Sequence, residues 1–193
     1  MSLGKGEHFE IPVHKPSIRE QFFFLLSGMI ISVPLTLFIN TSIASFLEGL
    51  FHPFYIALLS TAILAPITEE FAKSYPLFYR HGETERSIFK LGFLTGLGFG
   101  ISEFFLYVLV YRAPVFIRLF GILFHACNTS IVAFGLAKKR LLLFYLVAVF
   151  LHFSNNFLAI FGPMSFLGGI TILILTYMFS LVLYKKTTEK AVD

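Results

Sequence analysis

The chain has 193 residues, of which 56% are hydrophobic and only 13% are charged. Soluble domains carry about 25% charged residues, so this composition excludes an ordinary soluble domain and indicates a membrane protein. The formal net charge of +4 does not indicate nucleic-acid binding, because orientation in a bilayer also concentrates Lys and Arg. The single cysteine, Cys127, excludes an internal disulfide and a Cys-rich metal site. Any metal ligands must therefore be His and carboxylate side chains.

Six segments of the sequence are long and apolar enough to span a membrane, which takes about 20 residues of helix. In chain order they are residues 22–39, 53–79, 89–111, 115–137, 141–161 and 166–184. The connections between them are short, among them residues 40–52 and the break at Gly162 and Pro163. Helices adjacent in sequence are therefore expected to pack side by side. The sequence predicts an all-α polytopic membrane protein, a bundle of about six transmembrane helices.

The basic residues predict how these spans are oriented. Of the 15 Lys and Arg residues, only Arg112 and Arg118 fall on one side of the predicted bilayer. The positive-inside rule therefore predicts a multi-pass protein of the cell membrane with both termini in the cytoplasm. Residues 1–20 are expected to form a polar cytoplasmic segment and not a cleavable signal. Residues 21–184 are expected to form one six-helix transmembrane domain, and residues 185–193 a cytoplasmic tail.

Several titratable side chains fall inside the predicted spans, where charged groups cost about 2.5 to 3.5 kcal/mol each and usually serve a function. Counted from the basic residues at the helix ends, the carboxylates and histidines lie roughly 15 to 20 Å deep. One buried His is more often a packing residue, and Lys73 can form a simple i, i+4 pair with Glu69. Convergence of four helices on one layer instead indicates a built site, made of Glu69, Glu70, Lys73, Glu103, His125 and His152.

Prolines and glycines shape the helices that carry this layer. Pro66 precedes the carboxylate pair and Pro76 follows it. Each proline lacks a backbone donor, so the second helix is expected to be kinked or opened around the pair. On the third helix, Gly92, Gly96 and Gly100 form a small-residue stripe. Such a stripe favours close packing against a neighbouring helix.

Both histidines have polar neighbours on the same helix face. His125 is followed by Asn128 and Thr129, and His152 by Asn155 and Asn156. Residues three and four positions apart are neighbours on a helix surface. These amides and hydroxyls can support the imidazoles, and they can equally serve as ordinary contacts between helices.

Two neutral imidazoles and one carboxylate form the ligand set of a catalytic zinc ion. Glu103, His125 and His152 are the candidate ligands. A further carboxylate, Glu69 or Glu70, would act as general base and return the proton to the leaving amine. This combination favours hydrolysis. The H-E-x-x-H helix of soluble zinc proteases is absent.

Four segments resemble, in order, the motifs of the PrsW family of intramembrane proteases, which is distantly related to the CAAX-prenyl-protease membrane peptidases. They are EEFAK at 69–73, FGISEFFLY at 99–107, HACNT at 125–129 and HFSNN at 152–156. The resemblance implies a multi-pass membrane protease, proposed to be a metalloprotease. In some bacteria such proteases cut membrane-anchored anti-sigma factors. Residues 21–184 would then form the protease domain.

The resemblance to the CAAX branch is incomplete. There the second motif carries His where this chain has Glu103, which favours the PrsW branch. The position of Glu69 is considered the base in the CAAX branch. The i, i+4 rule instead ties Lys73 to Glu69 and leaves Glu70 free, so both glutamates stay candidates.

Two other functions remain open from the sequence. One is a metal-independent peptidase, in which a glutamate and a histidine activate water while His152 and Asn156 stabilise the oxyanion. The other is a cation or proton transporter, since carboxylates at mid-membrane depth also mark ion pathways. The leading hypothesis is a zinc-dependent endopeptidase acting on a membrane protein or peptide in the lipid bilayer, without a nucleic-acid partner.

Overall fold

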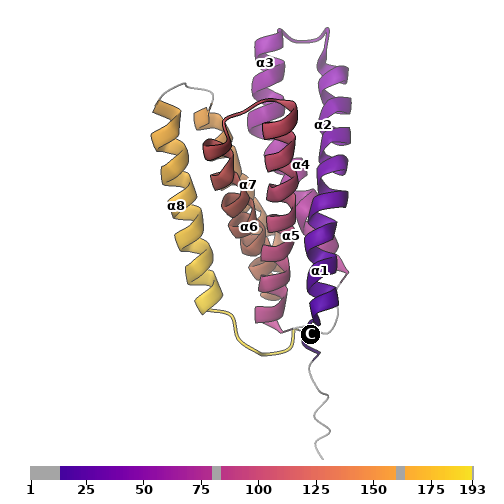
Figure 1. Ribbon diagram of the computed structural model, residues 1–193, viewed down its shortest axis with the longest axis vertical. Helices are drawn as coiled ribbons and strands as arrows, with labels where there is room; N and C mark the ends of the chain where they lie inside the picture. The colour runs from indigo at the N-terminus through magenta and orange to yellow at the C-terminus, as the bar shows by residue number, and fades with distance from the viewer. Residues whose placement is uncertain (1–13, 80–83, 160–163, 193) are drawn as a thin grey trace, which may run out of the picture.

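The computed structural model describes residues 14–79, 84–159 and 164–192. Its helices run roughly along one common axis (Figure 1). Six helical stretches are long and apolar enough to cross a membrane: Ile18–Leu47, Pro53–Phe78, Glu85–Val110, Val115–Ala137, Leu141–Ala159 and Leu167–Lys185. This architecture confirms the predicted fold class.

The first span is longer than predicted. Helix α1 (Ile18–Ser27) begins with a capping box between Ser17 and Glu20, and continues through a π-helical turn into α2 (Val33–Leu47). The expectation that the chain leaves the helix at Asn40 is therefore wrong. The Asn40 side chain accepts a hydrogen bond of 2.8 Å from the Thr68 hydroxyl. A polar residue that read as the start of a loop thus has a partner inside the bundle.

The second span is divided into four short pieces. Helix α3 (Pro53–Leu58) passes through π-helical residues 59–64 into α4 (Ala65–Ser74), and a 3₁₀ turn at Tyr75–Phe78 follows. Pro66 stands at the start of α4, and Pro76 stands in the 3₁₀ turn. The predicted distortion therefore flanks the carboxylate pair, and the pair itself lies on regular helix. Pro66 cannot donate the bond that a regular turn needs, which accounts for the irregular helix before it.

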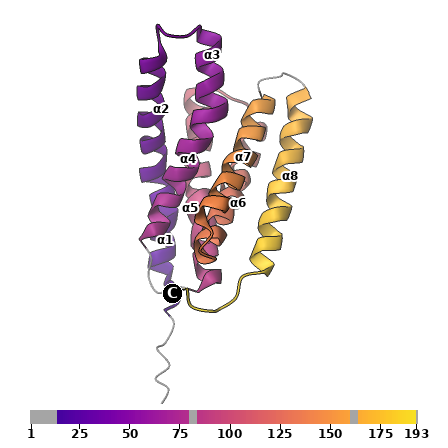
Figure 2. The same ribbon diagram turned by 180° about the vertical axis from the view of Figure 1, so that it is seen from behind.

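The remaining spans surround a central helix. Helix α5 (Glu85–Phe105) ends in a π-helical turn at Leu106–Val110, and α6 (Val115–Ala137), α7 (Leu141–Ala159) and α8 (Met164–Lys185) follow. Helix α6 carries more buried residues than any other described helix and packs against α5, α7 and α8 (Figures 1 and 2). The predicted break at 162–163 and the end of the fifth predicted span lie outside the described residues.

The glycine stripe on α5 packs closely against a neighbouring helix, as the sequence predicts, and this neighbour is α6. A Cβ atom built on Gly92, Gly96 or Gly100 would overlap with atoms of α6. At Gly96 the overlapping atoms are the backbone oxygen of His125 and the side chain of Thr129. Close contact between α5 and α6 therefore sets the position of the turn that carries His125.

We expect Gly96→Ala to destabilise the protein, because the added methyl group has no space and the opposing backbone of α6 must move. Overpacking of this kind costs about 1 to 3 kcal/mol. Gly169→Ala is the matched control, since its Cβ would lie 3.7 Å from the nearest side-chain atom, an ordinary contact. Thermal unfolding in detergent measures the effect. Equal unfolding temperatures for the two variants would contradict the assignment of Gly96 as a packing constraint.

The described chain begins and ends at the same end of the bundle (Figure 1), as an even number of spans requires. Beyond α8 the chain returns to the start of α5. There the Glu85 amide donates to the Lys190 carbonyl at 3.1 Å, and Arg86 donates to the Thr187 carbonyl at 2.8 Å. The segment after α8 is thus hydrogen-bonded to the first turn of α5.

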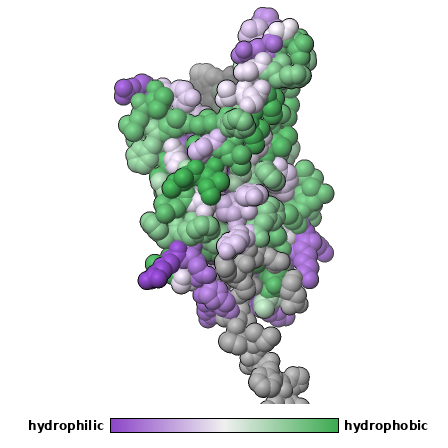
Figure 3. Space-filling view, turned by 90° about the vertical axis from the view of Figure 1, so that its right-hand side faces the viewer, coloured by the Kyte–Doolittle hydropathy of each residue, from purple (hydrophilic) through white to green (hydrophobic). Residues whose placement is uncertain are grey.

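Large apolar side chains are exposed along the outside of the helices. On the face shown in Figure 3, apolar residues cover a broad middle zone, and the most hydrophilic residues gather towards the two ends. This distribution is the reverse of a soluble protein surface and matches a hydrocarbon layer with polar regions on either side. The chain is a multi-pass membrane protein.

Candidate metal centre

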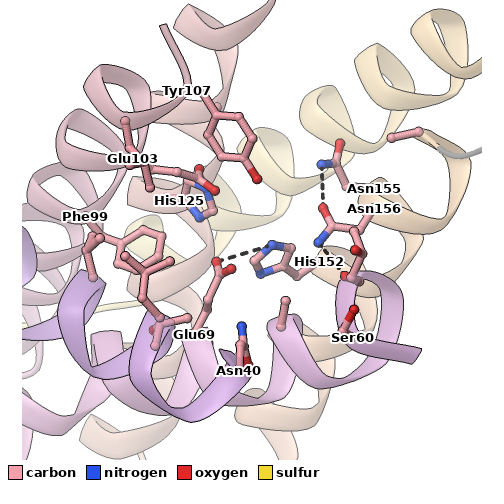
Figure 4. A pocket seen from close by; sticks show the side chains of 18 of the residues that line it. Asn40, Ser60, Glu69, Phe99, Glu103, Tyr107, His125, His152, Asn155 and Asn156 are labelled. Carbon is pink, nitrogen blue, oxygen red and sulfur yellow. Dashed lines mark hydrogen bonds and ion pairs between the residues drawn. The ribbon is translucent and has the colours of Figure 1, made fainter. Parts of the chain in front are cut away.

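Four helices bring titratable side chains together inside the bundle (Figure 4). Helix α4 supplies Glu69, Glu70 and Lys73, α5 supplies Glu103, α6 supplies His125 and α7 supplies His152. All of these residues are buried except Glu103, whose side chain is 19% exposed. The convergence expected from the depth of these residues is confirmed.

Lys73 is the buried cation of the site and pairs with Glu70. Its Nζ donates to Glu70 Oε1 at 2.6 Å and to His125 Nδ1 at 2.9 Å, and it lies 4.7 Å from the centre of the Phe99 ring. The i, i+4 pairing of Lys73 with Glu69 that would have freed Glu70 is therefore wrong. Helix α4 is rotated so that Glu70 and Lys73, at i and i+3, point to the same interior site.

Glu70 also holds His152. The Nδ1 atom of His152 lies 2.8 Å from Glu70 Oε1, and a carboxylate can only accept, so Nδ1 carries the proton. The lone pair of the neutral ring is then on Nε2, which lies 3.6 Å from Glu69 Oε2. A carboxylate behind a histidine is a recurrent way to orient a metal-binding imidazole. Glu70 is therefore bonded to both Lys73 and His152.

Glu103 bonds to the other histidine. His125 Nε2 lies 2.6 Å from Glu103 Oε2. Because Lys73 can only donate to Nδ1, the neutral ring carries its proton on Nε2 and donates it to Glu103. A cation on Nε2 would take the place of that proton. Lys73, His125 and Glu103 thus form one continuous chain of hydrogen bonds.

Glu69, His125 and His152 form a group suited to a metal ion. Each offers one ligand atom, and these atoms lie within 4.8 Å of one another. Among the described residues, Glu69 Oε2 has no hydrogen-bond partner although it is buried. A buried carboxylate oxygen without a donor is costly unless a cation faces it.

The charges of the site also fit a divalent cation. Three carboxylates and one ammonium group meet here, so the formal charge is −2 when both imidazoles are neutral. Such an excess of negative charge is unfavourable in a membrane interior. Imidazole and carboxylate are ligands of zinc and of neighbouring transition metals, and not the all-oxygen set that Ca²⁺ or Mg²⁺ prefers.

A cavity of about 510 Å³ is lined by Glu69, Glu103, His125 and His152. Its polar lining includes Asn40, Tyr107 and Arg118, which the sequence did not single out as site residues. The sequence places Asn40 in a predicted loop, and it places Arg118 on the side of the bilayer that carries few Lys and Arg residues. The one available signal was their polarity within or next to an apolar segment.

Among the described residues, the predicted supporting amides and hydroxyl have no hydrogen bond to either imidazole. Asn128 donates to the Ala148 carbonyl on α7 at 2.9 Å and so joins two helices. The Thr129 hydroxyl has no hydrogen-bond partner among the described residues. Asn156 donates to the Thr61 carbonyl at 3.0 Å and accepts from Asn155 at 3.4 Å. Asn155 and Asn156 both line the cavity (Figure 4).

Comparison with known protein families matches residues 17–184 to the PrsW family of intramembrane metalloproteases. The matched region covers the six spans, except for the last residue of the sixth, and every residue of the buried site. Comparisons with curated proteins and with solved structures found no match. Because the family match covers most of the chain and the site contains the His and carboxylate groups that a metalloprotease needs, the chain belongs to the PrsW family of intramembrane metalloproteases.

Proposed function

We propose that this protein is a zinc-dependent endopeptidase that cuts membrane proteins within or close to their transmembrane segments. The observation that carries the proposal is the buried group of Glu69, His125 and His152, with the unpartnered Oε2 atom of Glu69. Family membership supplies the reaction class. The identity of the ion as zinc rests on the ligand types, because imidazole and carboxylate together are typical of catalytic zinc sites.

We assign the ligands to His125, His152 and one carboxylate of the pair Glu69 and Glu103, and the base to the other carboxylate. The assignment made from sequence places Glu103 on the metal and Glu69 or Glu70 as base. The proximity of Glu69 to both histidines supports the reverse, with Glu69 as ligand and Glu103 as base. The bonds of Glu70 to Lys73 and His152 support a positioning role for that residue.

Under this assignment, each side chain has a separate role in the reaction. A bound zinc ion supplies Lewis acidity towards the scissile carbonyl and activates water. The base carboxylate accepts a proton from the attacking water and returns it to the leaving amine. Glu70 and Lys73, which bond to each other at 2.6 Å, keep the two imidazole rings in place through bonds of 2.8 Å to His152 and 2.9 Å to His125. Asn155 and Asn156, which line the cavity, are the amides available to the oxyanion.

Substrate access follows from the depth of the site. A transmembrane helix hides its carbonyls in i to i−4 bonds, so a substrate must unwind before its amide can reach the cavity. The polar cavity wall can hydrogen-bond to the unwound backbone, with Asn40, Tyr107, Asn155 and Asn156 as the groups facing it. The distribution of Lys and Arg supports an orientation with both termini in the cytoplasm.

We expect faster cleavage of a single-span peptide that carries Gly-Pro near the scissile bond than of the same peptide with Leu-Ala there. Relative to alanine, glycine costs about 1 kcal/mol and proline about 3 kcal/mol in a helix, so both residues favour the unwound form. The measurement is mass spectrometry of products formed by purified protein in lipid nanodiscs, with and without a chelator and with zinc added back.

Three results would contradict the proposal. Cleavage confined to soluble tails, at equal rates for both peptides, would exclude hydrolysis inside the membrane. Full activity of metal-free, chelator-treated protein would favour the metal-independent peptidase. Cation flux in proteoliposomes without cleavage of either peptide would favour the transporter.

A further inference from the structure

Arg118 is a cation at the wall of the cavity that the proposed reaction does not use. It lies one turn into α6 and is partly buried. Its guanidinium carbon lies 3.6 Å from the centre of the Tyr107 ring. Stacking on an aromatic ring holds the planar guanidinium group in one orientation and leaves its edge available for hydrogen bonds.

The guanidinium group has no carboxylate or carbonyl partner among the described residues, where its one recorded contact is the Tyr107 ring. A guanidinium group carries five N–H donors. Arg118 lines both the cavity of about 510 Å³ and a neighbouring one of about 240 Å³ on the α8 side. Its unused donors therefore border the space that a substrate would enter.

Arg118 and His125 lie on the same face of α6. They are seven residues apart, which is close to two full turns and roughly 10 Å along the axis. Gly121 lies between them, lines both cavities, and has open space where a Cβ atom would stand. The helix surface at Gly121, between Arg118 and His125, is therefore open to the cavities. An extended peptide covers that distance in about three residues.

We propose that Arg118 forms a subsite for a substrate carboxylate, placed about three residues from the scissile bond. The inference rests on the proposed peptidase function and adds a substrate preference to it. A carboxylate accepts two parallel bonds from one guanidinium group. Two sources can supply this group: the side chain of an Asp or Glu, or a free carboxyl terminus.

The test measures binding and does not depend on turnover. The probes are labelled single-span peptides with an amidated end and a Gly-Pro break. Each peptide carries one Glu, and the series places this Glu at every position from one to six residues on either side of the break. A Gln peptide matches each of them. Fluorescence anisotropy then compares the two affinities for the protein in nanodiscs of uncharged lipid, in the presence of chelator to prevent cleavage. A further peptide ends at the preferred position with a free acid or an amide.

At one position near the third residue, Glu should bind about ten- to a hundredfold more tightly than Gln, as a charge-assisted hydrogen bond provides. Arg118→Gln should reduce this ratio to about one, and Arg118→Lys, which keeps the charge but not the planar fork, should retain part of it. Arg112→Gln is the matched control. Arg112 is exposed on the same side of the protein and does not line either cavity, so the ratio should stay at the wild-type value.

A preference for the free acid over the amide would identify the chain end as the carboxylate source, and a preference for internal Glu would identify the side chain. A ratio near one at every position, or a ratio that survives Arg118→Gln, would overturn the subsite. Failure of the peptidase function would look different. The binding preference would then be present while the same peptides stay uncut in zinc-loaded protein.

Discussion

Alanine at His125 or His152 is expected to remove the bound metal and to abolish hydrolysis. Each substitution takes away one of two imidazole ligands, and no other histidine belongs to the group of ligand atoms in the described residues. The metal content of purified protein, measured by plasma mass spectrometry, should fall from about one ion per chain to background. Metal affinity should also fall as the pH drops below the range in which imidazole is neutral, because a protonated ring cannot bind a cation.

His14→Ala is the matched control for these variants. His14 is exposed, precedes the first span, bonds to Glu20 in the first turn of that span, and lies far in sequence from the site. It should keep metal and activity at the wild-type level. If His125→Ala kept the wild-type metal content, the candidate metal centre would be wrong, whatever its effect on cleavage.

Glutamine at Glu69 and at Glu103 should separate the ligand from the base. Glutamine keeps the size of the side chain and its hydrogen bonding but cannot take up a proton, so the base variant should lose about 10² to 10⁴-fold in rate. That variant should still hold metal. The ligand variant should lose metal together with activity, because the neutral amide replaces a charged ligand. We expect metal loss at Glu69 and metal retention at Glu103.

The opposite pattern would restore the assignment made from sequence, with Glu103 on the metal and Glu69 as base. Glu48→Gln is the control, since Glu48 is exposed at the end of α2. Wild-type cleavage rates in both Glu69→Gln and Glu103→Gln would exclude either residue as the base. Hydrolysis and metal content must be measured on the same preparations, because neither value alone distinguishes the ligand from the base.

The sequence by itself determined the six spans, the layer of polar residues and the family resemblance. Span length and apolar composition follow directly from the thickness of a bilayer, so they need no knowledge of neighbouring helices. Depth follows from the regular rise of a helix. Glu70, Glu103, His125 and His152 could therefore be placed in one layer from counting alone. The glycine stripe was equally readable, because small residues at i and i+4 serve close helix contacts.

Only the tertiary structure decided which neighbours the polar groups bond to. Adjacent residues such as Glu69 and Glu70 point about 100° apart on a helix. The rotation of α4 therefore selects Glu70 for Lys73 and His152, and turns Glu69 towards the cavity. That rotation is set by packing against several helices at once. Asn40 and Arg118 line the cavity for the same reason. The direction of a side chain depends on how the helices pack, whereas the sequence pattern gives only the spacing of residues along a helix.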